Sequence, residues 1–447
     1  MKRIVTFLGL ASAAYIHGAA IEQVVVRQQW PWSTDVKVEY KISGVTKPVD
    51  LKVTAYNGDV LLDQSNLDAS ITGRRLGIEE DGVGEFTIDP VKAFGTDKAA
   101  IANFKVKLDV VDTSESMSKV LYKIIDLTSG EIDDVTTADL LSGGYGAVET
   151  GGQTITPAGD IDETKVYWTG VTNEDVYATT SIVLRRVPSG GKTYKMGAAP
   201  GEIGNGSGYT YANWSNRGKE TQHEVSFQKD FFIGVYEITQ KQYNLLTSKW
   251  PSNFKNTAYR NTRPVEKVSW DMATGTFLPA LNTLTKKTFI LPTEAQWEYA
   301  YRAGTTTGLY SGKDVLWDYR DHKKGLDTNV DPLGRYVANA GGTSPENTAD
   351  TTQGTAKVGS YQCNNWGIYD MLGNVREWCS DYFQEDLGSE AQTDPQGPET
   401  GTLRVVRNSS WAFAQNANGS CRAAFRAANG PTFTGSNTGF RIALMAE

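Results

Sequence analysis

The first quarter of the chain alternates apolar and polar residues with a period of two. The alternation is regular over residues 36–42, 49–56 and 104–110, and Asn57-Gly58 marks a tight turn. Strands of this kind, separated by turn residues, are typical of an antiparallel sandwich. We therefore expect an antiparallel, immunoglobulin-like β-sandwich over residues 21–111. Catalytic residue types do not cluster in it, which favours an adhesive or spacer module.

The next segment is less regular. Residues 121–127 (LYKIIDL) predict a strand, and the glycine-rich stretches at 142–146 and 151–152 predict loops. We interpret residues 112–180 as a connector that packs on one neighbouring domain or on both.

Short strands and capped helices fill residues 181–447. Thr239 with Gln242, and Thr293 with Gln296, have the spacing of capping boxes, in which each side chain bonds the other residue's backbone N–H.

One further helix is expected to be irregular. It begins near Trp270, and Gly275 and Pro279 interrupt its pattern, which predicts a short or kinked helix.

The N-terminus has the pattern of a secretory leader. Lys2 and Arg3 precede a short apolar run over residues 4–14, and small residues follow at 18–20. We expect residues 1–20 to be a signal peptide and the mature protein to be secreted or periplasmic. No later segment is apolar enough to span a membrane.

Composition narrows the class of partner. The net charge of -8 provides no basic surface, so nucleic acid is not expected as a partner. The chain has 3 Cys, at Cys363, Cys379 and Cys421, and two of them could pair in an oxidising compartment. With only 3 His and no CxxC pair, a zinc site is not favoured.

Three linked motifs carry a resemblance to a known family. They are residues 291–300 (LPTEAQWEYA), 365–378 (NWGIYDMLGNVREW) and 437–441 (NTGFR), in this order. Together they resemble the formylglycine-generating enzyme (sulfatase-modifying factor) family. The resemblance implies a variant of the C-type lectin fold over residues 181–447, an α+β domain with much irregular structure.

The resemblance also places the family's oxidase chemistry, which uses two copper-binding cysteines. An ungapped count back from the NTGFR ending puts Phe413 and Asn418 at those two positions. A thiolate is the soft ligand that a cuprous ion selects, and neither a phenyl ring nor an amide replaces it. We therefore expect no catalytic residues and no copper. The family's substrate groove is expected at Ser410, Trp411, Phe413 and Arg426. The alternative for Ser410 and Arg426 is structural: a hydrogen-bonded loop residue and an ion pair that lines the groove.

Calcium is the cofactor that the resemblance implies, as a structural ion. It wants six to eight oxygen ligands. The first implied set comprises the side chains of Asp370 and Glu377 with the carbonyls of Gly373 and Val375. The second comprises Asn339, Ala340, Asp350 and Thr352. The alternative is that these polar residues only cap turns.

The family fold also implies a disulfide. It brings the segment of Cys421 beside the strand that ends near Cys379, so we expect these two to pair and Cys363 to remain a thiol.

Three hypotheses for function follow. The first is an exported, calcium-stabilised binding or structural module that is not a competent oxidase, with a protein or glycan ligand still to be identified. The second is an active formylglycine-generating-type oxidoreductase with unrecognised chemistry, using Cys421. The third is a lectin-like recognition protein with a variable C-terminal site in the loops 408–418 and 429–437, which are rich in Asn, Ser, Gly and aromatic residues.

Overall fold

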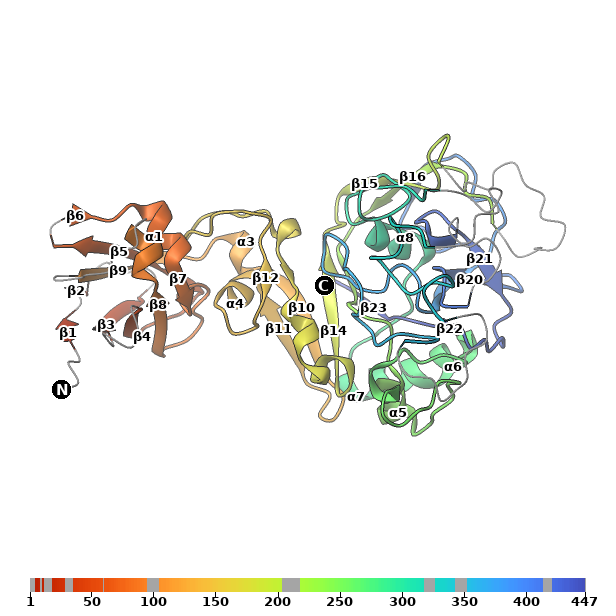
Figure 1. The fold of residues 1–447 in the computed structure, drawn as a ribbon, viewed down its shortest axis with the longest axis horizontal. Helices are drawn as coiled ribbons and strands as arrows, with labels where there is room; N and C mark the ends of the chain where they lie inside the picture. The colour runs from red at the N-terminus through yellow and green to blue at the C-terminus, as the bar shows by residue number, and fades with distance from the viewer. Residues whose placement is uncertain are drawn as a thin grey trace. The chain divides into compact units, whose positions relative to one another are not determined.

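The chain divides into two compact units, residues 1–121 with 135–171, and residues 122–134 with 172–447 (Figure 1). The computed structural model describes residues 5–8, 10–11, 18–28, 35–58, 60–94, 104–202, 218–316, 326–341, 352–412 and 420–446.

Two larger sheets lie in the described part of the N-terminal unit. The strand order of the first is β1-β3-β4-β8-β7, made of Val5–Leu8, Ala20–Gln28, Val36–Ser43, Gly82–Ile88 and Ile71–Gly73. The order of the second is β2-β9-β5-β6, made of Leu10–Ala11, Phe104–Asp112, Val49–Asn57 and Val60–Leu61. Neighbouring strands are antiparallel, except that β2 runs parallel to β9.

Period-two alternation explains how these sheets pack. Along β4 the side chains alternate between buried and more exposed, and Val38, Leu51 and Leu108 from three strands are fully buried in one core cluster. The prediction of antiparallel sheets here is confirmed, and their arrangement is consistent with a β-sandwich.

Short elements complete this unit. They are α1 (Gln64–Ser70), α2 (Pro90–Phe94), α3 (Glu115–Ser118), α4 (Thr137–Leu141), η1 (Glu163–Lys165) and the two-stranded sheet of β12 (Val148–Glu149) and β13 (Tyr167–Trp168). η2 (Gly170–Asn173) reaches the boundary between the units, and η3 (Asp175–Ala178) follows it.

Part of the range predicted as a leader lies in these sheets. The backbone of β1 pairs with β3, and that of β2 pairs with β9. Removal of residues 1–20 therefore stays a prediction, and it would remove both short strands. Among the residues that the structure describes, no helix is long and apolar enough to cross a membrane.

The C-terminal unit contains three sheets. The strands in the order β11-β10-β14-β17-β23 are Ile132–Thr136, Val120–Asp126, Ser181–Val187, Phe231–Gly234 and Ala443–Met445. The order β15-β16-β19 comprises Lys192–Met196, His223–Phe227 and Gln392–Thr393. The order β21-β20-β18-β22 comprises Ala427–Asn429, Arg404–Arg407, Arg376–Tyr382 and Thr438–Gly439.

The predicted connector, residues 112–180, is divided between the two units. Its predicted strand is present as β10, which pairs with β14 of the C-terminal unit. Residues 122–134 therefore belong to the C-terminal unit, whereas residues 135–171 return to the N-terminal one.

Helices α5 (Gln240–Thr247) and α8 (Glu294–Arg302) begin at the two predicted capping boxes, and both boxes are present. η4 (Arg260–Thr262) is a further single turn. The helix after Ser269, predicted to be short or kinked, is continuous but irregular: α6 (Trp270–Met272) passes into the π-helical η5 (Ala273–Phe277) and then into α7 (Leu278–Thr285).

Candidate functional site

The turn at Gly373-Asn374 directly precedes β18 and is held by Glu237. Oε1 of Glu237 accepts a hydrogen bond from the N–H of Val375 at 2.9 Å, and Oε2 of Glu237 accepts one from the side-chain amide of Asn374 at 2.7 Å. Gly373 has a φ of 83°, and a Cβ there would lie 2.2 Å from the carbonyl oxygen of Arg335. Only glycine fits this position.

The two carboxylates of the first predicted calcium set lie near this turn, and most of their oxygens have partners. Both oxygens of Glu377 accept from Arg441, at 2.7 and 2.9 Å. Oδ2 of Asp370 accepts the N–H of Gly359 at 2.7 Å, whereas its Oδ1 has no hydrogen-bond partner among the described residues. One carboxylate oxygen of the set is thus available to a cation.

The two carbonyls of the set are also engaged. Nδ2 of Asn408 donates to the carbonyl of Gly373 at 2.8 Å and to that of Val375 at 3.1 Å. Because a calcium ion would need these same oxygens together with both carboxylates, the residues do not fit it in this arrangement.

Two of the three buried carboxyls near this turn, Asp370 and Glu237, have raised pKa values, which favours their uncharged forms. Burial, opposed in part by Gly359 and Arg441, raises the pKa of Asp370 to about 6. Burial and the nearby carboxylates of Asp370 and Glu377 raise the pKa of Glu237 well above its ordinary value. Within the described ranges, no group of three His, Cys, Asp or Glu side chains could hold a metal ion.

In the second predicted set, Asp350 lies outside the described residues. The carbonyls of Asn339 and Thr352 both accept from Nη1 of Arg335, at 2.8 and 2.9 Å. The carbonyl of Ala340 accepts a backbone N–H at 3.0 Å. Calcium at this second set stays a prediction.

The predicted groove residues are buried. Ser410 accepts from Asn437 at 3.2 Å, and Nε1 of Trp411 donates to the carbonyl of Ser436 at 3.0 Å. Arg426 forms a two-point ion pair with Glu294, with N–O distances of 2.7 and 2.8 Å. These three side chains are thus engaged inside the domain, and their role in lining a groove stays a prediction.

The two positions that replace the family's cysteines, Phe413 and Asn418, lie outside the described residues. That replacement therefore rests on the sequence.

A buried ion network extends from Arg426 and was not anticipated. Arg407 donates to Glu294 at 2.9 Å and to Glu298 at 2.7 Å, and Glu298 also accepts from Arg302 at 2.7 Å. Burial alone would raise the pKa of Glu294, but the two arginines Arg426 and Arg407 outweigh burial and lower this pKa to about 2. Because the i,i+4 spacing of Glu294 and Glu298 puts both on one helix face, the sequence did contain a signal for shared partners.

The buried carboxylate of Glu266 supports the loop next to Trp411. Oε1 of Glu266 accepts the backbone N–H groups of Asn253 and Phe254, at 2.6 and 2.9 Å. The ring of Phe254 meets Trp411 edge-on, with centroids 5.1 Å apart. Oε2 of Glu266 has no described partner, and burial raises the pKa of this carboxyl to about 8.

The predicted disulfide is not present. Cys363, Cys379 and Cys421 are all thiols in this structure, and the pairing of Cys379 with Cys421 stays a prediction. The two buried thiols have different neighbours: Asp381 and Glu294 lie near Cys379, whereas Ser409 and Asp327 lie near Cys421. Burial raises the pKa of Cys421 to about 12, which makes it a weak nucleophile.

One C-terminal loop, residues 429–437, combines a fixed base with an exposed tip. Its carbonyls accept the N–H groups of Lys267 at 2.9 Å and of Asp271 at 3.2 Å, in addition to the indole of Trp411. At the tip, Phe433 is 42% exposed. The loop was predicted as a recognition site, but no sequence signal singled out Phe433.

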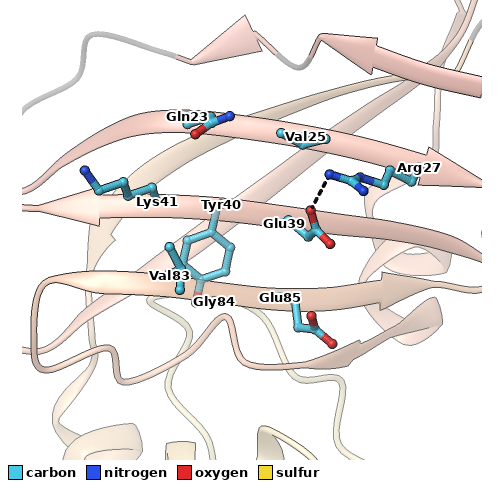
Figure 2. Close-up of a pocket in the computed structure, with 9 residues that line it drawn as sticks. All are labelled: Gln23, Val25, Arg27, Glu39, Tyr40, Lys41, Val83, Gly84 and Glu85. Carbon is cyan, nitrogen blue, oxygen red and sulfur yellow. Dashed lines mark ion pairs between the residues drawn. The ribbon is translucent and has the colours of Figure 1, made fainter.

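A hollow of about 420 Å³ lies on the first sheet of the N-terminal unit, over β3, β4 and β8 (Figure 2). Arg27 and Glu39 form an ion pair there at 3.1 Å. The Tyr40 ring extends to Gly84, where a Cβ would come within 2.2 Å of its hydroxyl. Exposed pairs of this kind are typical of a solvated sheet face, so we assign no site to the hollow.

Comparison with known proteins gives one family match. Residues 187–446 match the family described as sulfatase-modifying factor enzyme 1-like domain. The chain is similar to the formylglycine-generating enzyme of Streptomyces coelicolor, with 38% identity over 192 residues, which is 42% of this chain and 54% of the relative. It is 34% identical to the mouse (Mus musculus) enzyme of the same name over 185 residues, 41% of this chain and 45% of the relative.

The chain thus spans about half the length of the curated relatives that it matches. Among solved structures, Treponema denticola variable protein 1 matches with 23% identity and a TM-score of 0.44, over 60% of this chain and 96% of that one.

Proposed function

Because the chain belongs, through residues 187–446, to the family of sulfatase-modifying factor enzyme 1-like domains, we propose how this member departs from the family's oxidases. It is a recognition module without oxidase activity, and it binds a protein or glycan ligand through its C-terminal loops. The observation that carries the proposal is the pair Phe413 and Asn418 at the positions of the family's two cysteines.

The burial of the remaining thiols supports this proposal. A copper-dependent oxidase needs two thiolates that can ionise and reach the metal. Cys421, the nearest cysteine in sequence to the altered positions, is buried, and its pKa is raised to about 12. Cys421 is therefore a protonated thiol at neutral pH in the metal-free protein, and one thiol cannot supply the pair of sulfur ligands that the family's copper site uses. Copper bound by the purified protein would reverse this choice.

The loop at residues 429–437 supports the recognition role. An aromatic side chain on a loop with a fixed base offers contact area with little loss of conformational entropy. Phe433 has this arrangement, since the carbonyls of Pro431 and Gly435 on either side accept hydrogen bonds from the domain. Aromatic residues are also frequent energetic anchors of interfaces. The same loop belongs to the third hypothesis, a lectin-like protein with a variable site.

The remaining assignments extend the proposal. The N-terminal sheets form an immunoglobulin-like spacer, and cleavage after residue 20 releases the protein to a secreted or periplasmic location. Calcium binds at the second set, through Asn339 and Asp350, and stabilises the loops there; its binding requires the Arg335 guanidinium to leave the carbonyls of Asn339 and Thr352.

The first prediction tests the lack of oxidase activity. Incubation of the protein with Cu⁺, oxygen and a Cys-x-Pro-x-Arg peptide should leave the peptide mass unchanged, because no cysteine pair is present to bind copper. The Streptomyces coelicolor relative serves as the positive control in the same buffer. Conversion of the peptide cysteine to an aldehyde by this chain would contradict the proposal.

The second prediction tests the recognition loop. Once a glycan array or a panel of surface proteins identifies a ligand, Phe433→Ala should weaken binding by tenfold or more, the loss of about 1.4 kcal/mol expected of an aromatic anchor. The melting temperature should not change, since the side chain is exposed. Val83→Ala is the matched control, because Val83 is 79% exposed on the N-terminal sheet. Equal affinity of the two variants would place the binding surface elsewhere.

A further inference from the structure

The side chain of Asn408 occupies the centre of the turn that was expected to bind calcium. Asn408 follows β20 with a φ of 73°, in the left-handed region that asparagine tolerates better than most residues. Its backbone therefore turns sharply, and its side chain is fully enclosed by protein.

The orientation of this amide is fixed by its contacts. Oδ1 accepts the N–H of Gly373 at 2.7 Å and that of Ser409 at 2.8 Å. If the amide oxygen and nitrogen were exchanged, the N–H groups of the side chain would face the backbone N–H groups of Gly373 and Ser409. Nδ2 therefore faces the opposite way. It donates to three carbonyls, those of Asp370 at 3.1 Å, Gly373 at 2.8 Å and Val375 at 3.1 Å.

Three carbonyls that converge on one point create a region of negative potential. A calcium ion would lie about 2.3–2.6 Å from such oxygens. Here the positive end of the amide dipole lies at nearly the same place. The Glu377 carboxylate is likewise neutralised by a protein cation, Arg441, rather than by a metal.

We propose that the Asn408 amide takes the place of a calcium ion in this turn, so that residues 370–377 are ordered without metal at this site. Removing the amide leaves the carbonyls of Asp370, Gly373 and Val375 around an open space. The variant should then bind the ion that the wild-type chain excludes.

The test compares calcium content and thermal stability. Asn408→Gly removes the amide and keeps a backbone suited to positive φ. In native mass spectrometry, Asn408→Gly should bind one more Ca²⁺ per chain than the wild type. Calcium at 100 times its dissociation constant should raise the melting temperature of the variant above its value in EDTA by about 5–10 °C more than it does for the wild type.

Two further variants make the comparison specific. Ser248→Gly is the matched control, because Ser248 also has a left-handed φ, of 59°, but lies at the end of α5. It should bind as much calcium as the wild type. Asn408→Asp is used if the glycine variant does not fold, since it puts a carboxylate oxygen among the three carbonyls and should also require calcium.

Calcium at the second predicted set would be common to all of these proteins and cancels in the differences. The proposal is overturned if Asp370→Asn removes one Ca²⁺ from the wild-type chain. It is also overturned if neither variant of Asn408 takes up an additional ion.

Discussion

Arg407→Ala should lower the free energy of unfolding of the C-terminal unit by about 3–5 kcal/mol, the usual cost of removing one partner from a buried ion pair. The guanidinium is fully buried between Glu294 and Glu298 and also bonds the carbonyl of Ala423. Without it, Glu294 keeps Arg426 and Glu298 keeps Arg302, but each carboxylate loses a charge-assisted hydrogen bond. The measurement is the urea midpoint of the C-terminal transition.

An exposed ion pair in the same unit is the matched control. Lys195 and Glu224 pair at 3.2 Å across β15 and β16, and their side chains are 60% and 49% exposed. Lys195→Ala should change the free energy of unfolding by less than about 1 kcal/mol, because solvent screens the pair. Equal effects of Arg407→Ala and Lys195→Ala would mean that the buried network contributes no more than a surface pair.

The C-terminal unit should lose a few kcal/mol of stability between about pH 4.5 and pH 8 because of Glu266. Burial raises the pKa of this carboxyl to about 8, although the N–H groups of Phe254 and Asn253 and the charges of Lys267 and Arg263 oppose the shift. Below about pH 4.5 the carboxyl is protonated in both states, so the stability is fully present. As the pH rises to 8, the unfolded chain releases its proton first, and unfolding is favoured.

Glu266→Gln should reduce the slope of this pH dependence, because the amide keeps an acceptor for the two N–H groups and does not titrate. Asp370 and Glu237, whose pKa values burial also raises, keep the remaining slope. Chemical unfolding at intervals between pH 5 and 8.5 gives the measurement. Glu224→Gln is the control, since Glu224 is exposed and should leave the slope unchanged. A slope that is identical in the wild type and in Glu266→Gln would show that the carboxyl does not titrate within this range.

Local patterns in the sequence anticipated the elements well. The alternation over residues 36–42 and the capping boxes at Thr239 and Thr293 depend on neighbours within a few residues, and all of them are present. The sequence also indicated an irregular helix after Ser269, although its π-helical form was not foreseen.

The candidate site was less predictable, because its properties depend on contacts between distant residues. Glu377 and its partner Arg441 are 64 residues apart in the sequence, and Glu294 and its partner Arg407 are 113 residues apart. The sequence indicated which carboxylates lie near the turn, but not that an amide and a guanidinium already occupy their surroundings. The disulfide prediction depends on the same kind of information, since nearness of two segments does not fix the direction of two side chains.

Residues 122–134 belong to the C-terminal unit, whereas the residues on either side belong to the N-terminal unit. This affects how proteolysis or truncation could separate the two units. The chain passes between the two units three times, near residues 121, 134 and 171. A protease that cuts at one of these passages leaves two other covalent links between the units. A C-terminal fragment that starts at residue 181 would also lack β10 and leave the edge of β14 without its strand partner. Neither unit can therefore be expressed as one uninterrupted piece of the gene.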